Sequence, residues 1–391
     1  MQVHEQCESK QKVWTIGGKM KICILSMQRV KNYGSLLQAY SLKKLIESLG
    51  HDVSFIDILP NEKDNEKRKS VMKYDEGQKV GSNNFLQRVL SQDNHVYYSI
   101  MKAVSKKRVQ RKQEAFQCDV LKLSPQDNKS NYDVCVIGSD EVFNCMNDAP
   151  WGFTTQLFGN VAQASAVITY AASCGFTRYD MLSDELKGAI RKAFQNIAAF
   201  SVRDNNTKCF VEELREISPQ INLDPVAVGD FDVEIKNVNL RGKLPKRYCI
   251  IYAYHDRINS PHEIKAITEF CQRHNLTPVT IGGYQKWVHK HLALSPFEVL
   301  AAVKQADFVI TDTFHGTLFS IKYAKRFAVI VRESNRNKLS DLIMRFGAEK
   351  HELQTIEDIE LAYSYIPDRV RIDATIEKER KCSLRYLEEN L

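Results

Sequence analysis

The sequence predicts an α/β protein made of two doubly wound halves that face each other across a central cleft. Short apolar segments with the length of buried strands alternate with amphipathic segments of helical period along most of the chain. Residues 228–246 interrupt this alternation with glycine, proline and mixed charges, which is typical of a linker. A chain of 391 residues also favours two domains over one.

The first half, which we place at 20–230, begins with a strand–helix–strand unit. Residues 21–26 predict a strand, 35–49 a helix with its leucines along one face, and 51–58 a second strand. Strands joined through a helix run parallel, with a right-handed crossover. The other predicted elements of this half are strands at 132–144, 166–173 and 199–204, helices at 183–197 and 205–216, and a closing strand at 221–226.

The alternation starts again after the linker, and we place a second domain at 245–372. Ser260 and Pro261 predict the start of a helix, because proline is favoured at the first helical position. A charged final helix at 373–391 is expected to pack back on the first domain. The predicted elements of the second domain are strands at 247–254, 277–283, 307–311 and 326–331, and helices at 260–274, 295–306, 317–325 and 336–346.

Two segments fall outside this alternation. Residues 1–19 show little periodicity and are interpreted as a disordered extension. Residues 61–123 predict a helical insertion in the first domain, and its 62–112 part is rich in lysine and arginine. This basic segment is either a solvated helical face or a surface that attracts anionic membrane headgroups or a diphosphate-linked substrate. Nucleic acid is not expected as a partner, because no recognition motif accompanies the charge.

Several classes of protein are excluded by composition. No apolar run reaches eighteen residues, so no transmembrane helix is expected, and the N-terminus has no apolar stretch typical of a signal peptide. The ten cysteines have no CxxC spacing, which indicates reduced thiols and no zinc or iron–sulfur site. We therefore expect a cytoplasmic protein without a bound metal.

Polar turns follow several of the predicted strands, at the edge where open α/β sheets bind ligands. Asn32, Tyr33 and Gly34 lie just before the first helix, where backbone N–H groups could hold an anion. The alternative for this turn is simple capping of the helix by Ser35.

A second turn holds Ser139 and Asp140. Asp140 is a candidate acceptor for a sugar hydroxyl, or a base, and its alternative is a helix cap. A third turn holds Arg203, whose guanidinium could grip a carboxylate or phosphate with two parallel hydrogen bonds. The alternative for Arg203 is an ion pair with Asp204 or another nearby carboxylate.

The richest turn belongs to the second half, in the stretch VITDTFHGTLFSI at 309–321. His315 can act as an acid or a base near neutral pH. Gly316 permits close backbone approach, and a helix expected from Thr317 adds the positive end of its dipole. Asp312 lies beside them in the sequence. Further positive charge follows the next strand at Arg332, Arg336 and Lys338. These turns together predict a cationic site suited to a small polyanion.

The motifs NYGSLLQAYSLKKLIESLGHDVSFIDI, VIGSDEVFN, ITYAASCG, SVRD, LDPV and VITDTFHGTLFSI occur in this order. As an ordered set covering about 20–346, they resemble the polysaccharide pyruvyl transferase family. The resemblance implies a GT-B-like pair of Rossmann-type domains. It also implies transfer of the pyruvyl group of phosphoenolpyruvate onto two hydroxyls of a sugar, which forms a cyclic ketal.

Residue roles follow from the same resemblance. Arg203 is expected to bind phosphoenolpyruvate, and His315 is expected to act as acid or base. The family also has a basic residue after the strand that follows the FHG turn, which matches Arg332, Arg336 or Lys338, with Lys338 ranked last. The usual GSDQVWN is GSDEVFN here, so Glu141 and its neighbour Phe143 depart from the pattern on the acceptor side.

The resemblance further implies a lipid-linked or polymer glycan as acceptor, in capsule or exopolysaccharide assembly. A sugar on undecaprenyl diphosphate at the inner face of the membrane fits the basic segment, with the protein held there peripherally. No cofactor is expected, because phosphoenolpyruvate is the donor substrate. Two alternatives stay open: a GT-B glycosyltransferase that uses a nucleotide sugar, and a non-catalytic subunit of a polysaccharide assembly complex.

Overall fold

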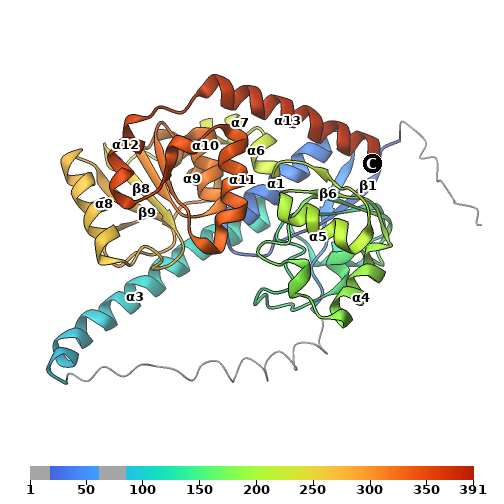
Figure 1. Cartoon of the computed structure of the whole chain (residues 1–391), viewed down its shortest axis with the longest axis horizontal. Coiled ribbons are helices and arrows are strands. Elements are labelled where there is room, and N and C mark those ends of the chain that lie inside the picture. Colours follow the sequence, from blue (N-terminus) through green and yellow to red (C-terminus); the bar gives the residue numbers. More distant parts are fainter. Residues whose placement is uncertain (1–17, 61–84) are drawn as a thin grey trace, which may run out of the picture.

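The computed structural model describes residues 18–60 and 85–391. The extension predicted at 1–19 lies outside them except for its last two residues, and so does the 61–84 part of the predicted insertion. Two parallel sheets, each covered by helices, lie side by side (Figure 1). The predicted architecture, α/β with two doubly wound domains, is therefore confirmed.

The N-terminal sheet has seven strands in the order β2-β1-β3-β4-β6-β7, with β5 paired to β4. Its central strand β3 is buried at eight of nine positions, which explains its continuous apolar sequence. Its strands are β1 Lys21–Leu25, β2 Asp52–Phe55, β3 Tyr132–Asp140, β4 Ala164–Ala172, β5 Ile197–Ala199, β6 Ser201–Val202 and β7 Gln220–Ile221. Its main helices are α1 Tyr33–Ser48, α4 Asp184–Phe194 and α5 Asn205–Arg215.

The C-terminal sheet has six strands in the order β10-β9-β8-β11-β12-β13. They are β8 Tyr248–Ala253, β9 Thr277–Gly282, β10 Lys290–His291, β11 Phe308–Thr311, β12 Phe327–Ile330 and β13 Glu352–Leu353. The helices around them are α8 Pro261–Arg273, α9 Pro296–Gln305, α10 Phe314–Tyr323, α11 Arg336–Phe346 and α12 Ile359–Ser364. Ser295 begins α9 with a capping box to Glu298, so local sequence fixes where this helix starts.

One apolar core is shared by the two domains. Leu36 and Leu37 of α1 belong to the same buried cluster as Val299 of α9 and Phe319 of α10. The Tyr33 hydroxyl also donates to the carbonyl oxygen of Leu294, at 3.0 Å, across the same boundary. The carboxyl ends of the two sheets are therefore held facing each other.

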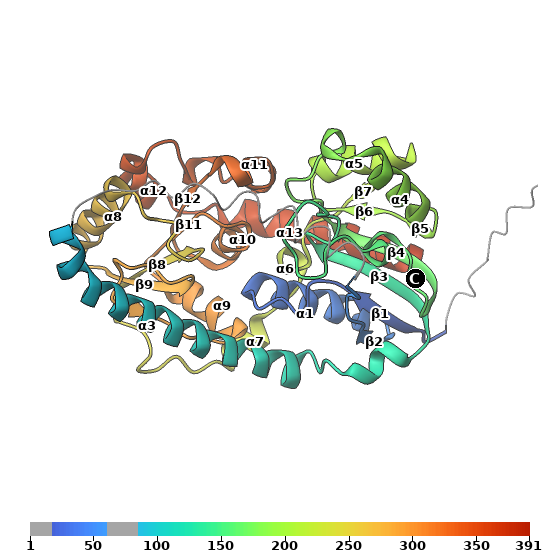
Figure 2. The ribbon, with the colours of Figure 1, turned by 90° about the horizontal axis from the view of Figure 1, so that it is seen from below.

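The basic insertion forms a long helix, α3 Phe85–Ala115, which crosses from one domain to the other. Figure 2 shows α3 running beneath both domains and ending near α1 and β2. Lys102 forms an ion pair with Asp256 at 2.7 Å, and Lys112 lies 3.9 Å from Glu298. This helix thus belongs to the first domain in chain order, while its contacts include the second.

The final helix, α13 Arg369–Asn390, crosses back in the same way. Arg369 donates to the carbonyl oxygen of Ile321 in the C-terminal domain, at 2.6 Å. Near its other end the Tyr386 hydroxyl donates to the carbonyl oxygen of Thr169 in β4, at 2.8 Å. The helix therefore ties the two domains together.

Three of the differences from the predicted elements concern the FHG turn and the linker region. The helix expected from Thr317 begins at Phe314, because the Thr313 side chain caps it. The closing strand predicted at 221–226 is only Gln220–Ile221, since Asp224 and Pro225 start the short helix α6 Pro225–Val228. The linker contains a further short helix, α7 Asp232–Lys236. No helix in the described part of the chain has the length and apolar character needed to span a bilayer.

Candidate functional site

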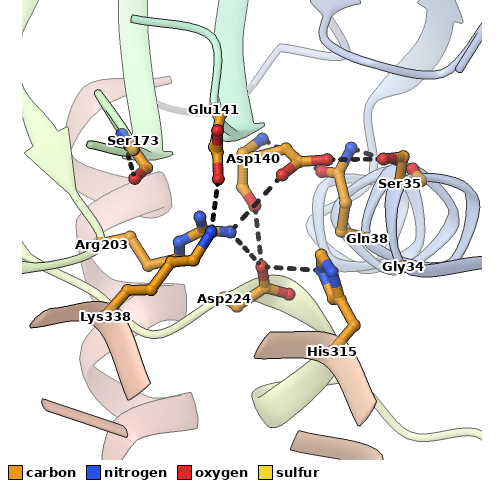
Figure 3. A network of polar contacts seen from close by, with 12 residues as sticks. Gly34, Ser35, Gln38, Asp140, Glu141, Ser173, Arg203, Asp224, His315 and Lys338 are labelled. Carbon is orange, nitrogen blue, oxygen red and sulfur yellow. Dashed lines mark hydrogen bonds and ion pairs between the residues drawn. The ribbon is translucent and has the colours of Figure 1, made fainter. Parts of the chain in front are cut away.

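A cavity of about 390 Å³ opens between the carboxyl ends of the two sheets, and we call it the central cavity. Residues from β3, β6, α10, α11 and the N-terminus of α1 meet there (Figure 3). Its lining residues are Met27, Val30, Asn32, Ser35, Asp140, Glu141, Asn147, Asp148, Ala149, Pro150, Trp151, Arg203, Tyr254, Phe314, His315 and Lys338. Arg203 and His315, predicted from separate turns, therefore share one cavity.

Arg203 follows β6 and is almost fully buried, with 6% of its surface exposed. Its Nη1 donates to Asp224 Oδ2 at 3.0 Å and lies 3.8 Å from Asp140 Oδ1. The guanidinium also lies over the Phe314 ring, 4.4 Å from the ring centre. Its buried Nε has no acceptor among the described residues. Because buried donors are rarely left unpaired, the Nε is a hydrogen-bond donor that the described residues alone do not satisfy.

Asp224 connects Arg203 with His315, as Figure 3 shows. It is buried, and its Oδ1 accepts the backbone N–H of Val226 at the start of α6. Its Oδ2 accepts from Arg203 and, at 3.3 Å, from the Ser139 hydroxyl. Burial raises the pKa of Asp224, but the nearby His315 and the charge of Arg203 lower it by a larger amount, to about 2. Asp224 is therefore a carboxylate at any physiological pH.

His315 lies in the first turn of α10, and its ring packs on Gly34 of α1. A Cβ atom at Gly34 would lie 2.1 Å from ring atoms, so only glycine leaves room for the imidazole. The Nε2 atom lies 3.5 Å from Asp224 Oδ2, which is beyond a good hydrogen bond but within range of charge attraction. Apart from this contact with Asp224, the buried Nε2 has no partner among the described residues.

The N-terminus of α1 holds the end of β3 in place. The Ser35 hydroxyl donates to Asp140 Oδ2 at 2.6 Å, and the backbone N–H of Ser139 donates to the Gln38 side chain at 3.2 Å. The prediction that Ser35 caps α1 is wrong, because the Asn32 side chain accepts from Gly34 N and provides the cap. Asp140, with a φ of +77°, is the last residue of β3 and caps no helix of the described chain.

Lys338 of α11 reaches across the cavity to Glu141, at 2.7 Å. Burial raises the pKa of Glu141, but the charge of Lys338 lowers it by a larger amount, so that the pKa is about 2. Arg332 instead bonds Glu263 at 2.6 Å, and Arg336 bonds the adjacent Glu333 at 3.1 Å. The structure thus brings Lys338, the residue that the sequence ranks last, into the central cavity, and does not bring the other two.

The remaining predicted residues of the FHG turn support the turn itself. Asp312 is fully buried, 3.0 Å from the guanidinium of Arg257. The backbone N–H of Gly316 and the hydroxyl of Thr317 both bond Thr313, at 3.0 Å and 2.9 Å. None of the three predicted residues lines the central cavity. They fix the backbone that presents His315.

The expectation of a cationic site is wrong for the central cavity. Three carboxylates line the central cavity, at Asp140, Glu141 and Asp148, beside the cations Arg203 and Lys338. The acids come from loops far from the basic residues in the sequence, so only the fold reveals their pairing. Sequence reasoning also missed Asp224, although an aspartate before proline in the LDPV motif is a recognisable helix start.

No three metal-ligating side chains converge within the described parts of the chain. The family model for polysaccharide pyruvyl transferases matches residues 32–334, which include the central cavity's residues from Asn32 to His315. The chain belongs to the polysaccharide pyruvyl transferase family. The resemblance that the motifs indicate is thus confirmed. Sequence comparison of this family member with curated proteins gives no match.

Several solved structures are similar to this family member over most of their length, at low sequence identity. A complex of Methanocaldococcus jannaschii UDP-GlcNAc 2-epimerase with UDP-GlcNAc and UDP is 11% identical, with a TM-score of 0.48, covering 95% of this chain and 99% of that one. A glycosyltransferase from a Streptomyces species is 10% identical, with a TM-score of 0.41, covering 94% and 96%. At this similarity neither protein informs the activity of the present one.

Proposed function

We propose that this family member transfers the pyruvyl group of phosphoenolpyruvate to two hydroxyls of one sugar, forming a cyclic ketal and releasing phosphate. The observation that carries the proposal is the meeting of Arg203, Lys338 and His315 around the central cavity. Phosphoenolpyruvate places a carboxylate and a phosphate on one small frame, so its site needs fixed cations. The Nε side of the Arg203 guanidinium, which has no acceptor among the described residues, would bind either the carboxylate or the phosphate. Lys338 lines the same cavity and would bind the other group.

The reaction balances without a further reagent. One sugar hydroxyl adds to C2 of phosphoenolpyruvate while the methylene carbon takes a proton and becomes a methyl group. The bond from C2 to the phosphate oxygen then breaks, and a second hydroxyl bonds C2 to close the ketal. The two hydroxyl protons end on the methyl group and on the released phosphate.

His315 is the group we assign to proton transfer. Among the described residues its Nε2 has no partner other than the ionised Asp224, 3.5 Å away. The imidazole either gives the proton to the methylene carbon or accepts the one from the sugar hydroxyl. Asp224 positions the imidazole and faces its charge. Asp224 takes no proton itself, because the pKa of its carboxyl group is about 2.

The biological setting is part of the proposal. A lipid-linked or polymer glycan in capsule or exopolysaccharide assembly would give the acceptor an anionic carrier. Lys106, Lys107 and Arg108 on α3 are exposed, which supports peripheral contact with an anionic membrane face.

The proposal is tested by incubating the protein with phosphoenolpyruvate and a panel of sugar acceptors, both free and presented on anionic vesicles. Phosphate release is expected only when an acceptor is present, and the acceptor should gain the pyruvyl mass in mass spectra. The Arg203→Lys variant should need more phosphoenolpyruvate for half-maximal rate, because an ammonium does not reproduce the two-pronged contact. Transfer from a nucleotide sugar, with nucleotide released and no use of phosphoenolpyruvate, would identify a glycosyltransferase instead.

Gly34→Ala is expected to lower pyruvyl transfer by roughly 10²-fold, since the added methyl group displaces the His315 ring and a shift of about 1 Å has that effect on a catalytic group. The control is Gly188→Ala in α4, where a Cβ has nothing within 4 Å. It should keep full activity and gain roughly 0.5–1 kcal/mol in unfolding free energy. Steady-state rates and urea denaturation measure both. Full activity in Gly34→Ala would contradict the packing of His315 on α1.

A further inference from the structure

A second cavity, of about 160 Å³, lies on the other side of His315, and we call it the helix cavity because α3 forms one wall. The opposite wall is the carboxyl end of β8 and β9 in the C-terminal sheet, including Tyr252 and Gly282. Asn32, Tyr254 and His315 line both cavities. A ligand in the helix cavity therefore lies next to a ligand in the central cavity, and the imidazole lines both sites.

The helix cavity differs from the central cavity in its charge. None of the described residues that line it has a carboxylate side chain. Its basic lining residues are Lys31, Lys106, His255 and His315. Lys31 is paired with Glu114 at 2.5 Å. Lys106 forms no ion pair within 18–60 and 85–391. An uncommitted ammonium at the mouth of a cavity without carboxylates suits an anionic ligand.

The other lining groups suit a sugar. Tyr254 is half exposed, so a large part of its aromatic surface is accessible from the two cavities that it lines. His255 accepts the backbone N–H of Tyr284 on Nδ1, at 2.9 Å, so its neutral ring carries the proton on Nε2 as a donor. The amides of Asn32 and Gln110 add both donors and acceptors. Together they provide one aromatic surface and several hydrogen bonds for hydroxyls.

We propose that the helix cavity is the acceptor subsite, and that its ligand is a sugar carrying a phosphate ester, with the phosphate at Lys106 of α3. This inference rests on the proposed function and adds the class of acceptor and its place. The sugar hydroxyls face His315 and the donor in the central cavity, while the phosphate faces outward along the basic helix. The inserted helix thus serves as the acceptor-recognition element.

The test uses the 1-phosphates and the methyl glycosides of glucose, galactose, mannose and N-acetylglucosamine, together with the same sugars linked to polyprenyl diphosphate in neutral vesicles. For every sugar that accepts pyruvate, Lys106→Glu should raise the KM of the 1-phosphate about tenfold or more. The KM of its methyl glycoside and that of phosphoenolpyruvate should stay unchanged. The matched control is Lys192→Glu in α4, the same charge change at an exposed position that lines neither cavity, which should change none of them.

Each outcome decides the proposal. A lower KM for the lipid-linked sugar than for the 1-phosphate points to a lipid carrier, and equal values point to the phosphate alone; both support the subsite. An unchanged KM for the 1-phosphate in Lys106→Glu overturns it, as does an equal rise for the methyl glycoside or a rise for phosphoenolpyruvate. If the wild type transfers no pyruvate, the proposed function fails, and calorimetric titration with the 1-phosphates decides the cavity separately: binding weakened only by Lys106→Glu supports it, and absent or equal binding overturns it.

Discussion

Replacing His315 with alanine is expected to reduce pyruvyl transfer by about 10²-fold or more, while the chain remains folded. The imidazole lines both the central and the helix cavity, and its Nε2 has no partner among the described residues other than Asp224. Its loss removes the group that moves the proton between hydroxyl and methylene carbon. Steady-state phosphate release measures the effect, and the affinity for phosphoenolpyruvate should change little, since Arg203 remains.

Two further measurements separate chemistry from structure. Added imidazole should restore part of the rate of His315→Ala, because the alanine leaves room where the ring packs on Gly34. His262→Ala is the matched control: this histidine is exposed and pairs with Glu357 at the surface, so full activity is expected. Near-normal ketal formation by His315→Ala would remove His315 from the mechanism.

Replacing Asp224 with alanine is expected to lower the free energy of unfolding by about 3–5 kcal/mol, because it leaves the buried Arg203 guanidinium without its nearest carboxylate. Asp140, at 3.8 Å, is a weaker substitute. The same change frees the His315 ring from its facing charge, so transfer should also fall. Urea denaturation of the variant and the wild type measures the stability difference.

Asp232→Ala is the control for this change. Asp232 is half exposed and lies 3.5 Å from Lys304, and breaking such a surface pair should alter stability by about 0–1 kcal/mol. Equal losses in the two variants would show that Asp224 does not hold a buried charge. A stable Asp224→Ala protein with full activity would contradict the role assigned to the Arg203, Asp224 and His315 contacts.

The sequence predicted the order of strands and helices well, because the local periods of buried strands and amphipathic helices are strong in this chain. It also predicted that Arg203 and His315 share a site, since each follows a strand at the carboxyl edge of one of the two sheets that face each other. The sequence could not indicate that Lys338, and not Arg332, is the basic residue that enters the cavity. Which basic side chain enters the cavity depends on the start of α11 and on the position of Glu141, which is supplied by the other domain.

The charge of the site illustrates the same limit. A run of lysines and arginines is visible in a sequence, whereas the acids that pair with cations arrive from distant loops. Glu141 and Asp224 are 62 and 21 residues away from Arg203 along the chain. Glu141 nevertheless lines the same cavity as Arg203, and Asp224 pairs with the Arg203 guanidinium. The position of α3 could not be predicted from the sequence either, because nothing in the periodicity of this helix indicates that it lies against the opposite domain.

The apolar cluster that joins α1 to α9 and α10 has a mechanical consequence. In many two-domain enzymes a flexible hinge lets the lobes swing widely around the substrate. Here a wide swing would expose leucine and phenylalanine side chains of both lobes to water, and α13 would have to release one of its ends. Substrates of this enzyme must therefore enter and leave a gap whose walls move by small sliding adjustments. A larger motion of the two domains would require cooperative unfolding of the whole molecule.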